Sequence, residues 1–166
     1  QLEAAFYVKV VSSFYSGSTP AEQAILTDIR DHEVIHREFF KAALGANAIA
    51  ALSVDFTSIN FASRASVLGA AKVFEDLGVS AYNGAGQLIT NPDYLVVAGK
   101  IVSVEARHAA AIRDLLAPKT ASFAGDDVVD VMTGLDVVNP PSTVLDSSHA
   151  GAYVTSSINA SGIPTA

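Results

Sequence analysis

Residues 33–36 read Glu33-Val34-Ile35-His36, and residues 105–108 read Glu105-Ala106-Arg107-His108, which is the same Glu-x-x-His pattern 72 positions later. A further Glu precedes each copy, because Glu3 and Glu75 are also 72 residues apart, and the same offset carries Pro20 onto Pro92. Composition alone predicts only about 0.14 such pairs in this chain. The repeat therefore indicates two related helical hairpins, each with a Glu on its first helix and Glu-x-x-His on its second.

This pattern has the chemistry of a metal site. A Glu and a His three residues apart lie on one face of a helix, with Cβ atoms about 5 to 6 Å apart, so that both can reach one ion. Leu26, Ile29 and Ile112 lie on the same helical stripes, so the ligand face is expected to be the core face. Two hairpins supply six candidate metal ligands, namely Glu3, Glu33, His36, Glu75, Glu105 and His108.

The alternative is that these residues are solvated or hydrogen-bonded structural groups. Four buried carboxylates would repel one another unless cations compensated their charge. Two divalent ions would balance those four charges, so the charge balance favours the metal site over a purely structural role.

Charge and composition exclude several other classes. The chain has 166 residues and a formal net charge of −7, which argues against nucleic acid as a partner, since phosphates recruit clustered Lys and Arg. No apolar run approaches the roughly 18 to 20 residues of a transmembrane segment. Cys is absent, so any transition metal must use nitrogen and oxygen ligands.

Hydrophobic periodicity and helix-breaking residues predict four helices. They cover residues 1–15, 20–44, 65–89 and 92–116, with Thr19 and Asn91 as N-caps. Residues 45–64 show no sustained period and predict a long connection with one short turn of helix. Gly84 and its neighbouring glycines in the third helix predict close contacts with other helices.

The remaining chain has a different character. Residues 118–166 are rich in Ser, Thr, Val, Asp, Gly and Pro, with a short helix predicted at residues 126–132. We expect residues 1–117 to form the helical domain and residues 118–166 an extended tail. Apolar residues such as Val137, Val138 and Leu145 are too many for a solvated tail, so we expect it to pack on the helices or to join chains into a homo-oligomer.

Residues 1–116 resemble the ferritin-like superfamily, and segments 74–85 and 104–113 are similar to its exported, desiccation-related branch. The resemblance implies an all-α four-helix bundle of two hairpins joined by a long crossover. It implies two divalent metal ions, iron first and manganese second, bridged by Glu33 and Glu105. Glu3 and Glu75 would then be terminal ligands, with His36 and His108 one on each metal.

The resemblance also carries functional expectations. Redox chemistry with dioxygen or peroxide, of the oxidase or ferroxidase kind, comes first. Stress-related metal binding without turnover and a metal-free structural or assembly role are the alternatives, and export to the periplasm or outside the cell is implied. By comparison with the second hairpin, about two helical turns are expected to be missing before Glu3, which would leave Glu3 the least securely held ligand.

Overall fold

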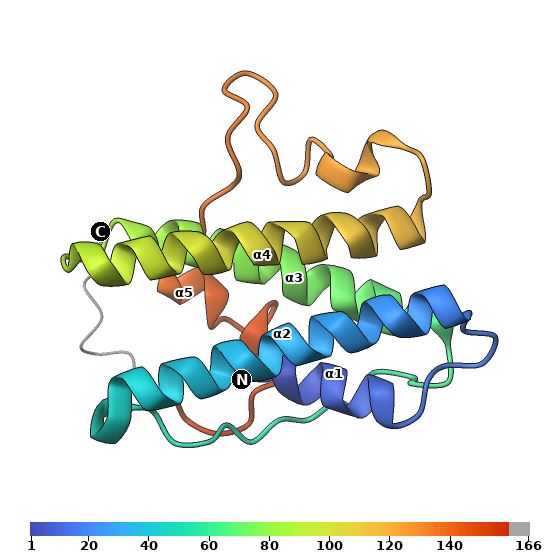
Figure 1. Cartoon of the computed structure of the whole chain (residues 1–166), viewed down its shortest axis with the longest axis horizontal. Helices are drawn as coiled ribbons and strands as arrows, with labels where there is room; N and C mark the ends of the chain where they lie inside the picture. Colours follow the sequence, from blue (N-terminus) through green and yellow to red (C-terminus); the bar gives the residue numbers. More distant parts are fainter. Residues whose placement is uncertain (160–166) are drawn as a thin grey trace. The chain divides into compact units, whose positions relative to one another are not determined.

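The computed structural model describes residues 1–159 and consists mainly of helices (Figure 1). The long helices are α1 (Leu2–Ser12), α2 (Pro20–Leu44), α3 (Arg64–Gly86) and α4 (Pro92–Leu116). The short elements are η1 (Gly45–Asn47), η2 (Ala121–Ala124), α5 (Pro141–Val144) and η3 (Ala150–Ala152). Within residues 1–159, no helix is both long and apolar enough to cross a membrane. All four predicted helices are present.

The described chain divides into two compact units. The first contains residues 1–67 and 153–158, and so holds α1, α2, the connection after α2 and the first turn of α3. The second contains residues 68–152 and residue 159, and so holds the rest of α3, α4 and most of the C-terminal segment. Each unit therefore has one of the two Glu-x-x-His helices.

In the first unit, strong local signals start α2. Thr19 and Glu22 form a capping box, in which Thr19 Oγ1 accepts a hydrogen bond from the Glu22 amide at 3.2 Å and Glu22 Oε2 accepts one from the Thr19 amide at 2.8 Å. Pro20 follows at the first helical position, where no backbone donor is needed. Helix α1 packs along α2, and Phe6 and Leu26 are fully buried.

Helix α1 ends at Ser12, three residues before the predicted end at Tyr15. Ser13 is extended, with a φ of −159°, and this stops the helix. Tyr15 is nevertheless buried. Its apolar ring therefore extended the apparent helical pattern into what is a loop.

The connection between α2 and α3 is held in the first unit by residues from the end of the described chain. Val54 and Val154 form an antiparallel bridge, and the Asp55 amide donates to the Tyr153 carbonyl at 2.8 Å. The ring of Phe56 lies 6.3 Å from that of Tyr153, centroid to centroid. The connection contains one helical turn, η1, as predicted, and then pairs with a segment far away in the sequence.

In the second unit, α4 begins as its sequence indicates. Asn91 Oδ1 accepts a hydrogen bond from the Asp93 amide at 2.9 Å, and Pro92 occupies the first helical position. Arg113 near the end of α4 pairs with Asp76 of α3, its Nε and Nη2 donating to the two carboxylate oxygens at 2.8 Å each. This bidentate ion pair ties α3 to α4.

Residues 128–137 of the C-terminal segment form a short β-hairpin. Val129 and Asp136 make its bridge, flanked by backbone hydrogen bonds. The predicted helix at residues 126–132 is therefore wrong. The Asp130 carboxylate accepts hydrogen bonds from the Met132 and Thr133 amides at 2.9 and 2.8 Å, and such local bonds compete with helix formation.

Gly84 of α3 lets this segment approach closely. A Cβ at Gly84 would overlap the carbonyl oxygen of Asn139. Asn139 is fixed there because its backbone amide donates to the Ser80 carbonyl at 3.0 Å and its side-chain amide to the Ser80 hydroxyl at 2.9 Å. At Gly84, the predicted close contact is thus with the C-terminal segment and not with a helix.

Candidate metal centre

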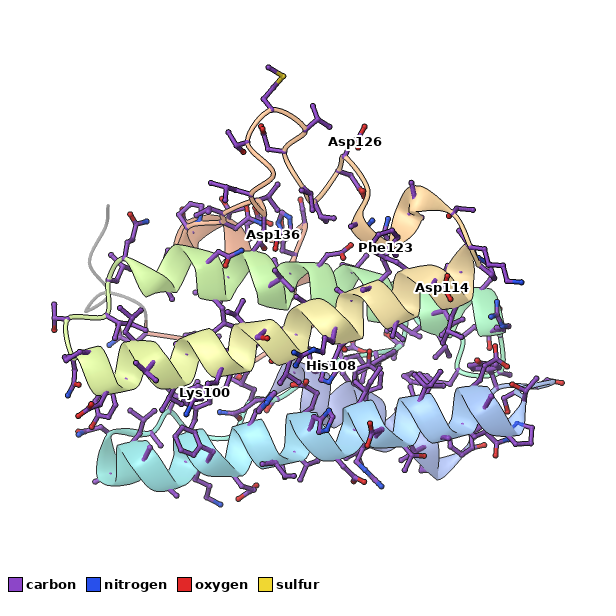
Figure 2. All side chains as sticks on the ribbon, turned by 45° about the horizontal axis from the view of Figure 1, so that its top comes forward. Lys100, His108, Asp114, Phe123, Asp126 and Asp136 are labelled. Atoms are coloured by element: carbon purple, nitrogen blue, oxygen red, sulfur yellow. The ribbon has the colours of Figure 1, made fainter. Side chains whose placement is uncertain are left out.

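Three predicted ligands lie together inside the second unit. Glu75 belongs to α3, whereas Glu105 and His108 belong to α4, and their exposed fractions are 0, 1 and 5%. His108 Nδ1 lies 3.4 Å from Glu75 Oε2 and 3.5 Å from Glu105 Oε2. Figure 2 shows His108 on α4. Two carboxylates and an imidazole thus converge in the interior of this unit.

The other three predicted ligands lie in the first unit. Glu33 is buried on α2, and His36 is half-buried one turn later, with its Nδ1 3.7 Å from Glu33 Oε1. Glu3 is half-buried in the first turn of α1. The Glu-x-x-His pair of α2 therefore repeats the arrangement on α4.

The geometry in the second unit fits a metal ion. Carboxylate and imidazole donors bind divalent transition metals at about 2.0 to 2.2 Å, so two donors on one ion are at most about 4.4 Å apart. The distances of 3.4 and 3.5 Å from His108 Nδ1 to the two carboxylates lie inside that limit. Glu75, Glu105 and His108 each offer a ligand atom within 4.8 Å of the others. They can share one ion after small side-chain movements.

The electrostatics point the same way. Two carboxylates buried this deeply and this close repel each other in an environment of low dielectric constant. A divalent cation would reverse the sign of that interaction and replace the hydration that both groups lose on burial. The donor set, oxygen with imidazole nitrogen and no thiolate, suits iron, manganese or zinc.

Comparison with known families now decides the fold family. The model of the ferritin-like domain matches residues 1–118. The chain belongs to the ferritin-like domain family. The match covers α1 to α4 completely, and the predicted all-α fold class, ferritin-like with four main helices, is confirmed. Searches of curated proteins and of solved structures found no match.

Membership of the ferritin-like domain family gives the repeat a structural meaning. The matched residues include both copies of the Glu-x-x-His motif and both single Glu positions. The sequence prediction placed these residues on the core faces of their helices. Glu33, Glu75, Glu105 and His108 are indeed buried, whereas Glu3 and His36 are half-buried.

The ferritin-like domain also contains a buried cation that sequence reasoning missed. Arg113 is 1% exposed, and besides the ion pair with Asp76 it donates to both oxygens of Asp127 at 2.9 and 2.8 Å and to the Ser122 carbonyl at 3.1 Å. All the N–H donors of its guanidinium are used. The hydrogen bonds that Arg113 donates, first those to Asp76 and then those to Asp127, raise the pKa of Arg113 above its ordinary value. The hydrogen bonds that Asp127 accepts from Arg113 lower the pKa of Asp127.

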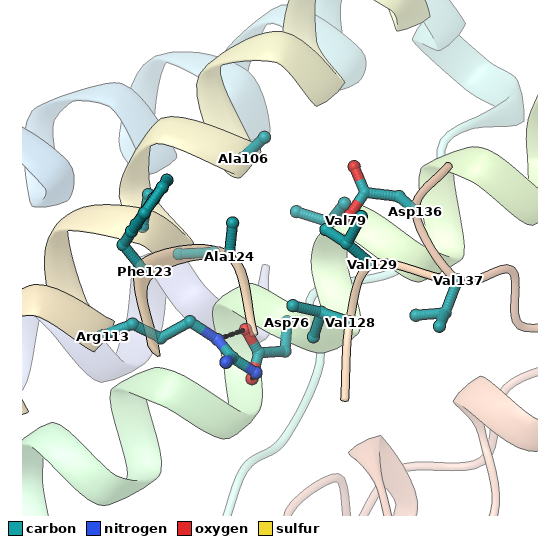
Figure 3. A pocket seen from close by; sticks show the side chains of 12 residues that line it. Asp76, Val79, Ala106, Arg113, Phe123, Ala124, Val128, Val129, Asp136 and Val137 are labelled. Carbon is teal, nitrogen blue, oxygen red and sulfur yellow. Dashed lines mark hydrogen bonds and ion pairs between the residues drawn. The ribbon is translucent and has the colours of Figure 1, made fainter. Parts of the chain in front are cut away.

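One sequence signal could have identified Arg113. It follows Ala106, Ala109 and Ala110 at helical spacing on a face of α4 that has no other charge. A lone Arg on an alanine face must either reach solvent or find carboxylates. Figure 3 shows it paired with Asp76 beside a pocket that these alanines help to line.

A further buried charge lies in the first unit. Glu22 Oε1 accepts a hydrogen bond from Arg64 Nε at 2.7 Å. The Thr19 amide, followed by Arg64, lowers the pKa of Glu22 to about 2. Burial, followed by the charge of Glu22, raises the pKa of Tyr15. This cluster fixes the start of α2 and is a structural feature.

Proposed function

We propose that this ferritin-like domain binds two divalent metal ions and uses them in redox chemistry with dioxygen or peroxide. The observation that carries the proposal is the buried group of Glu75, Glu105 and His108 in the second unit. The repeat extends the ligand set to Glu3, Glu33 and His36, because the two hairpins carry the same signature. Iron is the first candidate and manganese the second.

The roles of the ligands follow from the repeat and from the family resemblance. Glu75, Glu105 and His108 would hold an ion in the second unit. By the repeat, Glu3, Glu33 and His36 would supply the corresponding ligands from the first unit. Iron or manganese bound by these residues would supply the electrons for the reduction of dioxygen or peroxide.

The chain's own residues prepare the site for that chemistry. In the second unit, Ile101 and Ile112 are buried on the same stripe of α4 as Glu105 and His108, and they exclude water from this side of the site. His108 Nδ1 lies 3.4 and 3.5 Å from oxygens of Glu75 and Glu105, so the imidazole nitrogen is already placed beside two oxygen donors. Such preorganised ligands bind an ion without a large rearrangement.

Export and a protective role under stress remain part of the proposal. They rest on the similarity of residues 74–85 and 104–113 to the exported, desiccation-related branch. In that role the metals would be bound without turnover. The two roles differ in a measurable way, because redox chemistry consumes dioxygen or peroxide repeatedly whereas sequestration consumes at most one equivalent.

The test is the metal content of the purified protein and of protein reconstituted anaerobically with iron or manganese. We expect close to two ions per chain, and well under one ion per chain after both treatments would refute the proposal. The double variant Glu105→Ala/His108→Ala should lose the metal while retaining its helical circular dichroism. A matched control, Glu38→Ala/His149→Ala, removes the same two residue types outside the site and should bind metal normally.

A further inference from the structure

The hairpin at residues 128–137 carries an exposed apolar tip. Val131, Met132 and Leu135 have exposed fractions of 69, 88 and 67%. The hairpin projects away from α3 and α4 of its own unit (Figure 1). A group of exposed apolar side chains on a projecting element marks an interaction surface, and Met is common at such surfaces because its side chain adapts to a partner.

This tip is held in one conformation. The Asp130 carboxylate accepts hydrogen bonds from the Met132 and Thr133 amides, and the Gly134 amide donates to the Asp130 carbonyl at 2.7 Å. Gly134 adopts a φ of +68°, which favours glycine. The base of the hairpin is fixed by the ion pair between Asp127 and Arg113. A tip ordered in advance loses little conformational entropy on binding.

The charges around the tip select the class of partner. Asp126, Asp130 and Asp136 lie on or beside the hairpin, and Figure 2 shows Asp126 and Asp136 near its base. Anionic bilayers attract segments rich in Lys and Arg, so this surface would be repelled by them. The matching partner is a protein with an apolar hollow and a neighbouring positive charge.

The second unit itself contains such a hollow. A pocket of about 190 Å³ lies between α3, α4 and the segment after α4, and its walls include Val79, Ala106, Ala110, Phe123 and Val128 (Figure 3). An apolar cavity of about 150 Å³ accepts a group as large as benzene. The pocket therefore has room for the side chain of one methionine. Arg113 has no remaining donor for an anionic ligand, so an apolar occupant suits the pocket best.

Exposed positive charge lies on α4 beside the face that lines the pocket, although it does not line the pocket itself. Arg107 lies one turn before the pocket residue Ala110, and Lys100 lies two turns before Arg107 on the same helix. Both side chains are exposed, and within residues 1–159 neither makes an ion pair. Asp136 belongs to the opposite wall, on the hairpin. An incoming acidic hairpin would meet a cation along α4.

We propose that two copies of this chain associate through the second unit, with the apolar tip of each copy in the pocket of the other. Met132 enters the pocket, and the carboxylates beside the tip face Arg107 of the second copy. Every copy has both the tip and the pocket. When the two copies are related by a two-fold axis, the contact occurs twice and the assembly closes as a dimer. The dimer places no demand on the metal site and stands independently of it.

The first test is the molar mass in solution, measured by sedimentation equilibrium over a range of concentrations. The unmodified protein should form a dimer. Met132→Glu should weaken dimerisation by about 30-fold or more, the effect of losing a central anchor side chain. Ile35→Glu is the matched control, because it introduces the same charge at another apolar side chain of similar exposure, 62%. It should leave the dimer intact.

A monomer at all concentrations overturns the proposal, and so does a dimer that tolerates Met132→Glu. A series of ever larger oligomers also overturns it, because the proposed contact closes on itself. Circular dichroism of Met132→Glu checks that the variant folds. Since Met132 is exposed, its helical signal should match that of the unmodified protein.

A second test uses the absence of Cys from the chain. Protein with Met132→Cys is mixed with protein carrying Ala106→Cys under mild oxidation. The tip-in-pocket contact predicts a disulfide between the two variants in much higher yield than in either variant alone. Equal yields in the mixture and in Met132→Cys alone would show that the tips contact each other, and the proposal would be wrong.

Discussion

Replacing Arg113 by Met should destabilise the second unit more than any other single change of a charged residue there. Arg113 is buried, and its guanidinium satisfies Asp76 and Asp127 at once. Removing one partner of a buried ion pair costs about 3 to 5 kcal/mol, because the remaining charge loses its compensation. The Asp76 side chain is 18% exposed whereas that of Asp127 is 58% exposed, so water can compensate Asp127 but not Asp76.

We therefore expect Arg113→Met to lower the free energy of unfolding by about 3 kcal/mol, near the bottom of that range. With a urea m-value of about 2 kcal/mol/M, the unfolding midpoint should fall by roughly 1.5 M. The assay is urea unfolding of metal-free protein followed by circular dichroism. Asp76→Asn should couple strongly to Arg113→Met in a double-mutant cycle, and Asp127→Asn should cost under about 1 kcal/mol, as for an exposed pair.

Arg107→Met is the matched control, since Arg107 is exposed on the same helix. It should change the unfolding free energy by no more than about 0.5 kcal/mol. If Arg113→Met proves as mild as Arg107→Met, the reasoning from burial is refuted. Equal costs for Asp76→Asn and Asp127→Asn would refute the reasoning from exposure.

Three further predictions concern other features. The pKa of Glu22 is lowered from 4.5 to about 2, so its ionised form stabilises the fold above pH 4.5 and this stability is lost as the pH falls toward 2. The free energy of unfolding of Glu22→Gln, measured over the same pH range, should therefore fall less than that of the unmodified protein. Gly84→Ala should lower the melting temperature and expose residues 119–152 to limited proteolysis, because its Cβ meets the Asn139 carbonyl. The control Gly99→Ala places a Cβ in open space on α4 and should raise the free energy of unfolding by about 0.5 to 1 kcal/mol. Glu75→Gln should raise the stability of the metal-free protein, because it removes repulsion between buried carboxylates. The same variant should abolish the increase in melting temperature that iron or manganese causes in the unmodified protein. If iron or manganese still raises its melting temperature by the same amount, Glu75 is not a ligand.

The helices were predictable because their ends are set by local chemistry. Thr19-Pro20 and Asn91-Pro92 start α2 and α4 where the sequence indicated, and Gly45 ends α2. The end of α1 was not predictable, because Tyr15 is buried although it lies in the loop after α1. Hydrophobic periodicity cannot separate a buried loop residue from a helical one.

For the candidate site, the sequence predicted which residues share a helix face but not how deeply each one is buried. Helical spacing fixes which residues share a face, and the repeat supplied the pairing of Glu75 with Glu105 and His108 that the second unit shows. Spacing does not fix how deeply a residue is buried, so the half-buried positions of Glu3 and His36 could not be anticipated.

The C-terminal segment was the least predictable part. Its conformation depends on partners distant in the chain, such as Ser80 for Asn139. The Asp127–Arg113 ion pair likewise joins the C-terminal segment to α4, the helix that precedes it in the sequence. Neither contact leaves a local pattern, and the predicted helix at residues 126–132 failed for that reason.

The bridge between Val54 and Val154 has a consequence for how the protein is made. The first unit contains residues 1–67 but also residues 153–158, so it cannot be completed when its first part leaves the ribosome. At about 5 to 20 residues per second, the early part waits roughly 5 to 20 s for its last segment. During that interval the residues destined to face Tyr153 and Val154 are exposed, and this is when the nascent chain is most open to chaperones and to mispairing.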